Sequence, residues 1–272
     1  MDISKNINDY NLAFLDLETT GLDVVMGDAI CEIGALKVKD KRIIDKFHTL
    51  VNPGKSVPIE AYKVHKISDE ELKFAPLFEK VADKVKIFLN DSVVCAYNVG
   101  FDMGFLDYQL KNAGLEPLFI PAIDILSMAR DSLVLNRYNL ESVAQHLGID
   151  CSNGLHRALD DSMVAYQVFF RLIEIYREKG IEKLNDFVSL YGFSNDIVKT
   201  QDRVKAELIK DAISRQQKVY LKHFSANKVI ENERVLPLRI LEENRRFFLL
   251  YQGQGDNSCR ICSNRILDIV IT

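Results

Sequence analysis

Two carboxylates stand two residues apart directly after a short apolar run. Asp16 and Glu18 follow Leu12 to Leu15 in the stretch LAFLDLETTG. The run predicts a short buried strand that ends at the Thr-Thr-Gly turn. Because side chains at positions i and i+2 of a strand lie on one face, both carboxylates are expected to project together. Such neighbours repel each other, and a divalent cation with oxygen ligands, Mg²⁺ or Mn²⁺, would neutralise them. Two strand-end acids that only face solvent are the alternative.

A third carboxylate, Asp102, stands at a second predicted strand end. The apolar run from Val93 to Ala96 predicts a strand, and the spacing of Phe105, Leu106 and Leu110 predicts a helix soon after it. Asp102 therefore lies at a strand-to-helix junction, a position from which a carboxylate can point into a cleft. An acid in the first turn of a helix also stabilises the helix dipole, so a structural role is open.

A histidine and a fourth carboxylate lie close together in the stretch NGLHRALDD. His156 and Asp161 are five residues apart, which is about 140° around an ideal helix and puts them on different faces. They can share a site if His156 stands on the loop before a helix that runs to Glu178. The Asn153-Gly154 pair just upstream favours such a loop. This arrangement predicts a histidine that can accept a proton above a carboxylate-bound metal.

The elements that must position these residues alternate between strands and helices. We expect strands at residues 29–38, 43–51, 93–96 and 119–123, helices at residues 77–89, 125–130 and 138–147, and a long helix after the NGLHRALDD stretch that runs to Glu178. The first strands form a meander. The pattern predicts a mixed α/β sheet flanked by helices.

Composition narrows the class of protein. A length of 272 residues suggests about two domains, and 47% hydrophobic with 27% charged residues is typical of a soluble globular chain. No apolar run approaches the roughly 18 residues of a membrane span, and the N-terminus lacks a signal-peptide pattern. Five scattered cysteines fit reduced thiols in the cytoplasm. Cys259 and Cys262 lack the further ligands that a zinc site needs.

Charge divides the chain in two. Residues 1–198 carry 21 Lys and Arg against 30 Asp and Glu, a balance of −9, whereas residues 199–272 carry 14 against 9, a balance of +5. The basic second part suits an anionic partner, although a merely solvated basic face is the alternative.

Three motifs together resemble the DEDDh family of 3′–5′ exonucleases, and within it the epsilon-subunit group of bacterial DNA polymerase III. They are Asp16-x-Glu18-Thr19-Thr20-Gly21, Asn98-x-x-Phe101-Asp102 and His156-x-Ala158-x-x-Asp161, in this order over roughly the first 175 residues. The histidine five residues before the last aspartate separates this group from a sister group with tyrosine. The resemblance implies a ribonuclease H-like fold.

The resemblance also implies roles for individual residues. Two Mg²⁺ or Mn²⁺ ions would be held by carboxylates and would clamp the attacking and leaving oxygens of a phosphoryl displacement. The implied metal ligands are Asp16, Glu18, Asp102 and Asp161, and the implied general base is His156. Residues that match substrate-binding positions of the family are Thr20, Gly21, Leu22, Glu60, His65, Asn98 and Phe101. Tyr97 departs from the family, which often has histidine before Asn98; a phenol can still pack and hydrogen-bond there.

The C-terminal part resembles a WYL domain, a small Sm/SH3-like β-barrel. Short strands are expected near residues 219–221, 235–238, 247–251 and 266–271, with Phe247, Phe248 and Leu249 in the aromatic slot. The predicted organisation is an exonuclease domain at 1–178, a helical connector at 179–208 and a barrel at 209–272. Phosphate-binding candidates in the barrel are Arg234, Arg239, Arg260 and Arg265, beside the aromatic rings of Phe247, Phe248 and Tyr251. The alternative is that these rings fill the core of the barrel and that the arginines only make it soluble.

We therefore expect a metal-dependent 3′–5′ exonuclease that releases 5′-mononucleotides from single-stranded 3′ ends, with DNA favoured over RNA. Association with a polymerase and a nucleotide ligand in the C-terminal domain are further expectations, and no membrane partner is expected. The alternatives are an exoribonuclease and a sensor that grips 3′ ends or nucleotides with little catalysis. The 2′-hydroxyl is read by details of the cleft that the sequence leaves open.

Overall fold

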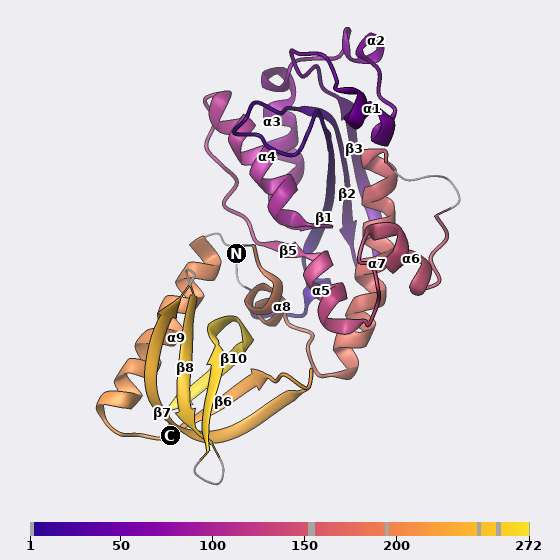
Figure 1. Ribbon diagram of the computed structural model, residues 1–272. Coiled ribbons are helices and arrows are strands. Elements are labelled where there is room, and N and C mark those ends of the chain that lie inside the picture. The colour runs from indigo at the N-terminus through magenta and orange to yellow at the C-terminus, as the bar shows by residue number, and fades with distance from the viewer. Residues whose placement is uncertain (1–2, 152–155, 194–195, 244–245, 254–256, 272) are drawn as a thin grey trace. The chain divides into compact units, whose positions relative to one another are not determined.

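The computed structural model describes residues 3–151, 156–193, 196–243, 246–253 and 257–271 (Figure 1). The predicted turn at Asn153-Gly154 lies outside these residues. By compactness the chain divides once: residues 6–174 form the first unit, and residues 175–271 with residues 3–5 form the second. The assignment of an exonuclease domain, a connector and a barrel at residues 178 and 208 stays a prediction.

The first unit is built on one five-stranded mixed sheet in the order β3-β2-β1-β4-β5. Its strands are β1 (Asn11–Thr19), β2 (Ile30–Lys39), β3 (Arg42–Leu50), β4 (Ser92–Ala96) and β5 (Ala122–Asp124). Strands β1, β2 and β3 form the expected antiparallel meander, and β4 and β5 continue the sheet in parallel to β1. The predicted mixed α/β sheet is confirmed.

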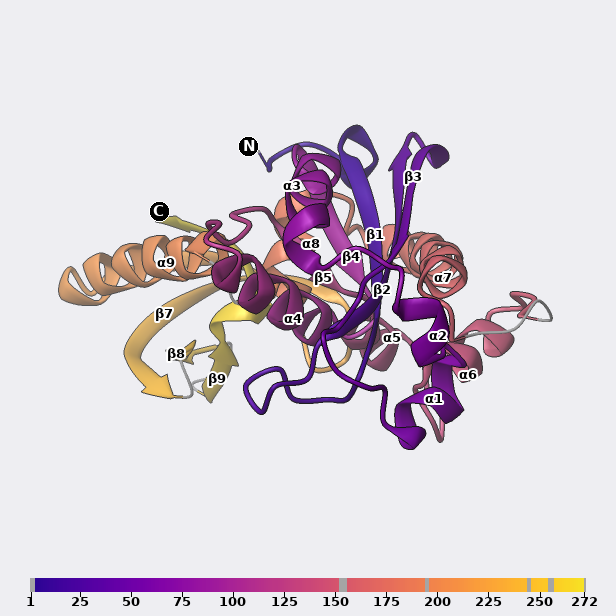
Figure 2. The ribbon, with the colours of Figure 1, turned by 90° about the horizontal axis from the view of Figure 1, so that it is seen from above.

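Strand β1 is central and is covered on both faces by helices. Helices α3 (Phe78–Leu89) and α4 (Val99–Asn112) cover one face, and α7 (Ala158–Glu178) covers the other (Figure 2). Phe14 is fully buried and its ring lies 5.3 Å from that of Phe169 on α7. Because side chains alternate along a strand, Asp16 and Glu18 lie on the same face as Phe14, the face that α7 covers.

Shorter helices complete the first unit. They are α1 (Ile59–His65), α2 (Asp69–Leu72), α5 (Ile125–Ser132) and α6 (Leu140–His146), with a 3₁₀ turn at Ile7–Asp9. Ser68 caps α2 in a reciprocal capping box with Glu71, which explains why this short helix forms. The strand expected at residues 119–123 is shorter and shifted, since β5 begins only after Pro121, which has no N–H to donate to a ladder.

The second unit pairs helices with an antiparallel sheet. Helices α8 (Leu184–Tyr191) and α9 (Asp196–Ser214) precede five strands in the order β10-β6-β7-β8-β9. The strands are β6 (Val219–Phe224), β7 (Ile230–Glu243), β8 (Arg246–Gln252), β9 (Ser258–Cys262) and β10 (Ile266–Ile271). Ile209 and Ala212 of α9 belong to the core of this unit.

A closed barrel is not found in the part of the chain that the structure describes. The long strand β7 pairs with β6 through Ile230–Val235 and with β8 through Leu236–Glu243, with an irregular register between Pro237 and Arg239. Strands β9 and β10 are the two edges of the sheet and are separated by a 3₁₀ turn at Ser263–Arg265. The WYL-like barrel therefore lacks support beyond an antiparallel sheet. None of the described helices has the length and apolar character to cross a membrane.

Candidate active site

Three of the four predicted metal ligands come together. Oxygen atoms of Asp16, Glu18 and Asp161 all lie within 4.8 Å of one another. The first two stand at the end of β1, and Asp161 stands in the first turn of α7 on the same face of the sheet. The Asp16–Glu18 pair thus meets a third carboxylate, and Glu18 is 9% exposed rather than open to solvent.

Asp102 lies next to this cluster. It is 2% exposed in the first turn of α4, its charge contributes to the raised pKa of Asp16, and the charge of Glu18 contributes to its own raised pKa. Asp124, at the end of β5, holds the start of α4, because its Oδ1 accepts hydrogen bonds from the N–H groups of Asn98 (3.1 Å) and Val99 (3.3 Å). The two parallel strands β4 and β5 thus present Asp102 at the edge of the sheet where β1 ends.

The cluster carries more negative charge than it can hold without a counter-charge. Burial, followed by repulsion from Asp161, raises the pKa of Glu18 from its ordinary 4.5 to about 8. Burial also raises the pKa of Asp161 to about 6, against the opposing effect of the His156 N–H. The pKa values of Asp16 and Asp102 are raised as well, mainly by burial. An all-carboxylate donor set of this kind fits hard divalent cations such as Mg²⁺ or Mn²⁺.

His156 stands on the loop before α7, as its spacing from Asp161 predicts. Helix α7 begins at Ala158, and the His156 side chain is exposed. The His156 N–H donates to both carboxylate oxygens of Asp161, at 3.1 and 3.3 Å. Its φ of 78° places a residue other than glycine in the left-handed region, a conformation that surrounding contacts must hold in place. The backbone of the candidate base is thereby tied to the candidate metal ligand.

The turn after β1 is ordered by Asp28. Thr20 is buried, its hydroxyl donates to Asp28 Oδ1 (3.2 Å), and it accepts from the N–H of Ala29 (3.0 Å). A Cβ on Gly21 would lie 2.3 Å from an Asp28 carboxylate oxygen, so only glycine fits at this position. Leu22 is 86% exposed and is free to contact a ligand.

The two predicted substrate residues of α1 lie in different environments. Glu60 is exposed in the first turn of the helix, whereas His65 at its end is 2% exposed. His65 Nδ1 accepts from the N–H of Ile67 (3.0 Å), so Nε2 carries the ring proton. That Nε2 atom is buried and has no hydrogen-bond partner among the described residues. The backbone of Thr19, at the end of β1, interacts with this ring and favours its protonated form, whereas burial lowers the His65 pKa.

The predicted lining residues before Asp102 are placed by local contacts. Asn98 is exposed and adopts a left-handed φ of 76° at the start of α4. Phe101 is half-buried, with its ring 4.8 Å from that of Phe105. The Tyr97 hydroxyl donates to the carbonyl of Tyr138 (2.6 Å), so the phenol packs and hydrogen-bonds as expected.

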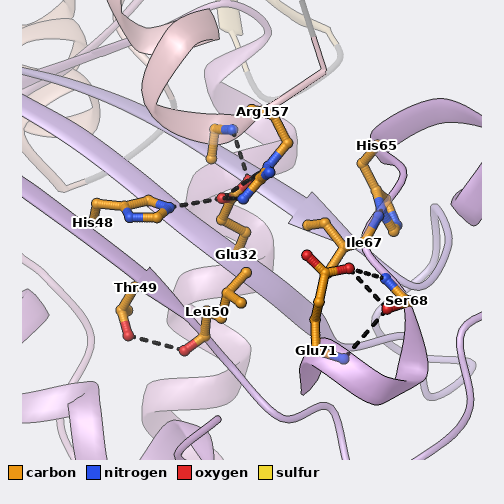
Figure 3. Close-up of polar contacts among 10 residues, drawn as sticks. Glu32, His48, Thr49, Leu50, His65, Ile67, Ser68, Glu71 and Arg157 are labelled. Atoms are coloured by element: carbon orange, nitrogen blue, oxygen red, sulfur yellow. Dashed lines mark hydrogen bonds and ion pairs between the residues drawn. The ribbon is translucent and has the colours of Figure 1, made fainter. Parts of the chain in front are cut away.

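One charged group beside the site was missed by the sequence reasoning. Glu32 on β2 is fully buried and is the Cα partner of Glu18 across the β1–β2 ladder. Figure 3 shows Glu32 between His48 of β3 and Arg157, the residue after His156. Burial opposes its ionised form, but hydrogen bonds from Arg157 and His48 hold the pKa of Glu32 below its ordinary value. The sequence does contain a sign of this group, because Glu32 is a single acid within the apolar stretch Ile30–Leu36.

The arginines predicted in the second unit do not form one site. Arg234 and Arg239 are exposed, Arg260 pairs with Glu243 (2.7 Å) over the ring of Phe248, and Arg265 is half-buried. A cavity of about 460 Å³ between α9 and strands β7 and β8 is lined by none of the four. Its charged lining is mixed: Arg203, Lys210 and Arg246 with Asp202, Glu207, Glu242 and Glu243.

Two of the three aromatic rings expected beside those arginines belong to the core. Phe247 and Tyr251 are each 5% exposed and pack in the core of the second unit, whereas Phe248 is half-buried. The rings of Phe247 and Tyr251 are therefore not available for stacking with bases, and for these two rings the core-filling alternative holds.

The second unit also contains a polar network of its own. His223 Nε2 lies 2.8 Å from Glu233 Oε1, which also accepts from the Tyr251 hydroxyl (2.8 Å), and Glu231 is nearby at 3.9 Å. Hydrogen bonds within this group account for its geometry. All five cysteines are free thiols, and Cys259 and Cys262 belong to no cluster of metal-ligating groups in the described residues.

Comparison with known proteins agrees with the motifs. The sequence model of the exonuclease family, RNase_T, matches residues 13–169. The epsilon subunit of DNA polymerase III from Rickettsia typhi is 34% identical over 211 residues, which cover 75% of this chain and 92% of that subunit. The PolC-type DNA polymerase III of Thermotoga maritima is 37% identical over 186 residues, or 68% of this chain. This chain spans only 14% of the length of that polymerase.

Solved structures share the fold at low sequence identity. A zinc-bound complex of E. coli ExoI with single-stranded DNA matches 97% of this chain and 64% of that chain, with a TM-score of 0.61 and 15% identity. The nuclease domain of 3′hExo, a DEDDh family member bound to rAMP, matches 61% of this chain and 92% of that chain, with a TM-score of 0.54 and 19% identity.

Proposed function

Because this chain belongs to the exonuclease family of the DEDDh type, we propose that it hydrolyses nucleic acid from the 3′ end and releases 5′-mononucleotides. The observation that carries the proposal is the meeting of Asp16, Glu18 and Asp161 within 4.8 Å. Three carboxylates from β1 and α7, with raised pKa values, are arranged to bind cations rather than to stabilise the fold.

Members of this family depend on divalent metals, and the donor set fits Mg²⁺ or Mn²⁺. Asp16, Glu18, Asp102 and Asp161 would hold two such ions. When bound, these ions would activate the attacking water and neutralise charge on the phosphate.

The chain's own residues would handle the proton and the substrate. His156 is the proposed general base, because it is exposed beside the cluster and its backbone is bonded to Asp161. The Nε2–H of His65 and the exposed carboxylate of Glu60 would contact the terminal nucleotide. Leu22, on the turn held by Thr20 and Gly21, would pack against its base. Asn98 and Phe101 would contact the terminal nucleotide on the side opposite to Leu22.

We propose single-stranded DNA 3′ ends as the preferred substrate. Support comes from the relatives that are subunits or types of DNA polymerase III and from the fold shared with an ExoI structure that holds single-stranded DNA. The same relatives motivate the proposal of polymerase association in the cytoplasm. An exoribonuclease is the second candidate, since the 3′hExo neighbour binds rAMP. The second unit is proposed to bind the strand or a nucleotide, through exposed Arg234 and Arg239.

A degradation assay tests the proposal. DNA and RNA strands of the same sequence, each labelled at the 5′ end, are incubated with the full chain and Mg²⁺ or Mn²⁺. The expected result is a ladder that shortens from the 3′ end, faster on DNA, together with 5′-mononucleotides. An Asp16→Ala preparation controls for contaminating nuclease. Binding of 3′ ends without cleavage would favour the sensor, and internal cuts would contradict an exonuclease.

A further inference from the structure

Glu32 makes an unusual number of contacts for a carboxylate in the middle of a sheet. Its oxygens accept from Arg157 Nε (3.1 Å to each) and Nη2 (2.6 Å), from the N–H of Ala158 (2.9 Å) and from His48 Nε2 (2.7 Å). Its side chain is completely buried. Burying a carboxylate is costly unless it is paired, and here the pairing is with a guanidinium fork and a helix N-terminus.

Two of the residues that Glu32 binds stand at the start of α7, the helix that carries Asp161. Arg157 follows His156, Ala158 opens α7, and Asp161 stands one turn later, where its N–H donates to the Arg157 carbonyl (2.9 Å). Glu32 therefore acts as a helix N-cap supplied by a strand more than a hundred residues away. Figure 3 shows Arg157 reaching Glu32 from the helix side and His48 reaching it from the opposite strand.

The neighbouring position on β2 docks the same turn of the helix. A Cβ on Gly34 would lie 2.2 Å from the carbonyl carbon of Ala158, so the helix backbone rests directly on the strand. The Ser162 hydroxyl donates to the carbonyl oxygens of Gly34 (2.9 Å) and Ala158 (2.8 Å). Since residues i and i+2 share a face, Glu32 and Gly34 form one docking surface for the start of α7.

The contact between β2 and the start of α7 affects the positions of His156 and Asp161. His156 has a left-handed backbone conformation that its neighbours must hold, and the residue after it is anchored to Glu32. The negative charge of Glu32 also repels Asp16, Glu18 and Asp161. A contact that served only to stabilise the fold would be better made by an uncharged residue, because that residue would not repel these three acids.

We propose that Glu32 is the positioning residue of this active site: it holds Arg157 and the N–H of Ala158 and thereby fixes where Asp161 and His156 stand. The inference rests on the proposed exonuclease function. Arg157 belongs to the same arrangement, because it joins Glu32 to the start of α7, whereas His48 binds Glu32 from β3.

Steady-state kinetics and metal binding test the proposal in the full chain. The substrate is the p-nitrophenyl ester of a 5′-mononucleotide, which is too small to depend on strand binding, and Mn²⁺ affinity is measured separately by calorimetry. Glu32→Gln is expected to lower kcat by about 10–100-fold and to weaken Mn²⁺ binding by about 10-fold, with KM changed less than kcat. Arg157→Lys, which keeps a half-exposed charge but loses the fork, should change both quantities in the same direction.

The matched control is His48→Ala, which removes another hydrogen bond to the same carboxylate oxygen and should keep kcat within about twofold of wild type. If Glu32→Gln fails to fold by circular dichroism, Arg157→Lys decides alone. The inference would be overturned if either folded variant kept the kcat and the Mn²⁺ affinity of wild type. It would also be overturned if His48→Ala lost as much kcat and Mn²⁺ affinity as the two variants. Neither result would affect the proposed function. An inactive wild-type enzyme would refute the proposed function, and the inference with it.

Discussion

Glu18→Gln is expected to make the metal-free protein more stable while abolishing its activity. Glu18 is 9% exposed and stands beside the carboxylates of Asp16 and Asp161. Its pKa is about 8 in the folded chain against an ordinary 4.5. The difference corresponds to about 3–5 kcal/mol of lost unfolding free energy when the group is ionised. Glutamine keeps the shape without the charge, and so removes this penalty.

The sign of the pH dependence follows from the same values. Because the folded chain binds the Glu18 proton more tightly than the unfolded chain, stability in EDTA should fall as the pH rises from about 4.5 to about 8. Above that range the penalty is fully present. Glu18→Gln should flatten this part of the profile, and the two proteins should differ most near pH 8. Added Mn²⁺ should stabilise wild type, by about 2.7 kcal/mol at 100 times its Kd.

Urea denaturation followed by far-ultraviolet circular dichroism measures these differences between pH 5 and pH 8.5. Glu79→Gln, on the exposed side of α3, is the control for removal of one negative charge. Wild-type stability that is constant or rises with pH in EDTA would refute the reasoning. So would a Glu18→Gln protein that is less stable than wild type at pH 8.

Alanine in place of any clustered carboxylate should reduce hydrolysis below detection while the circular dichroism spectrum is kept, and full activity in a folded variant would reject the metal assignment. These carboxylates are Asp16, Glu18, Asp102 and Asp161. His156→Ala should lower kcat by about 10²–10⁴-fold with unchanged Mn²⁺ affinity by calorimetry; rescue by excess metal would instead make His156 a ligand. Gly34→Ala puts a Cβ 2.2 Å from the Ala158 carbonyl carbon and should cost about 1–3 kcal/mol in urea denaturation. Exchange of Arg234 and Arg239 for glutamate should weaken single-strand binding and reduce its salt slope by about 0.7 per lost phosphate contact, measured by fluorescence anisotropy; an unchanged slope would argue against strand binding by these arginines.

Local spacing was enough to predict much of the candidate site. The alternation in β1 places Asp16 and Glu18 on one face, and the five-residue step from His156 to Asp161 requires a loop before α7. Both predictions depend on the geometry of a single element, strand or helix, which sequence periodicity reports directly.

Features that depend on distant partners were missed. Glu32 is one acid in an apolar strand, and its meaning comes from Arg157, which is 125 residues away in the sequence. The burial of Phe247 and Tyr251 was one of two alternatives that the sequence left open, and the alternation of buried and half-buried residues along β8 decides it. The failure of β9 and β10 to pair depends on the path of the whole sheet, which no local pattern describes.

The order in which the chain is synthesised has a consequence for when it can hydrolyse nucleic acid. Strand β1 leaves the ribosome early, but its parallel partner β4 comes some eighty residues later, and the helix that brings Asp161 docks on β2 later still. Contacts of such long sequence separation form only after the intervening chain exists, and they form slowly. A nascent or truncated chain that ends before residue 156 contains Asp16, Glu18 and Asp102 but lacks Asp161 and the proposed base, His156. We therefore expect the proposed hydrolytic activity to be absent during synthesis and to begin only when the first unit has folded.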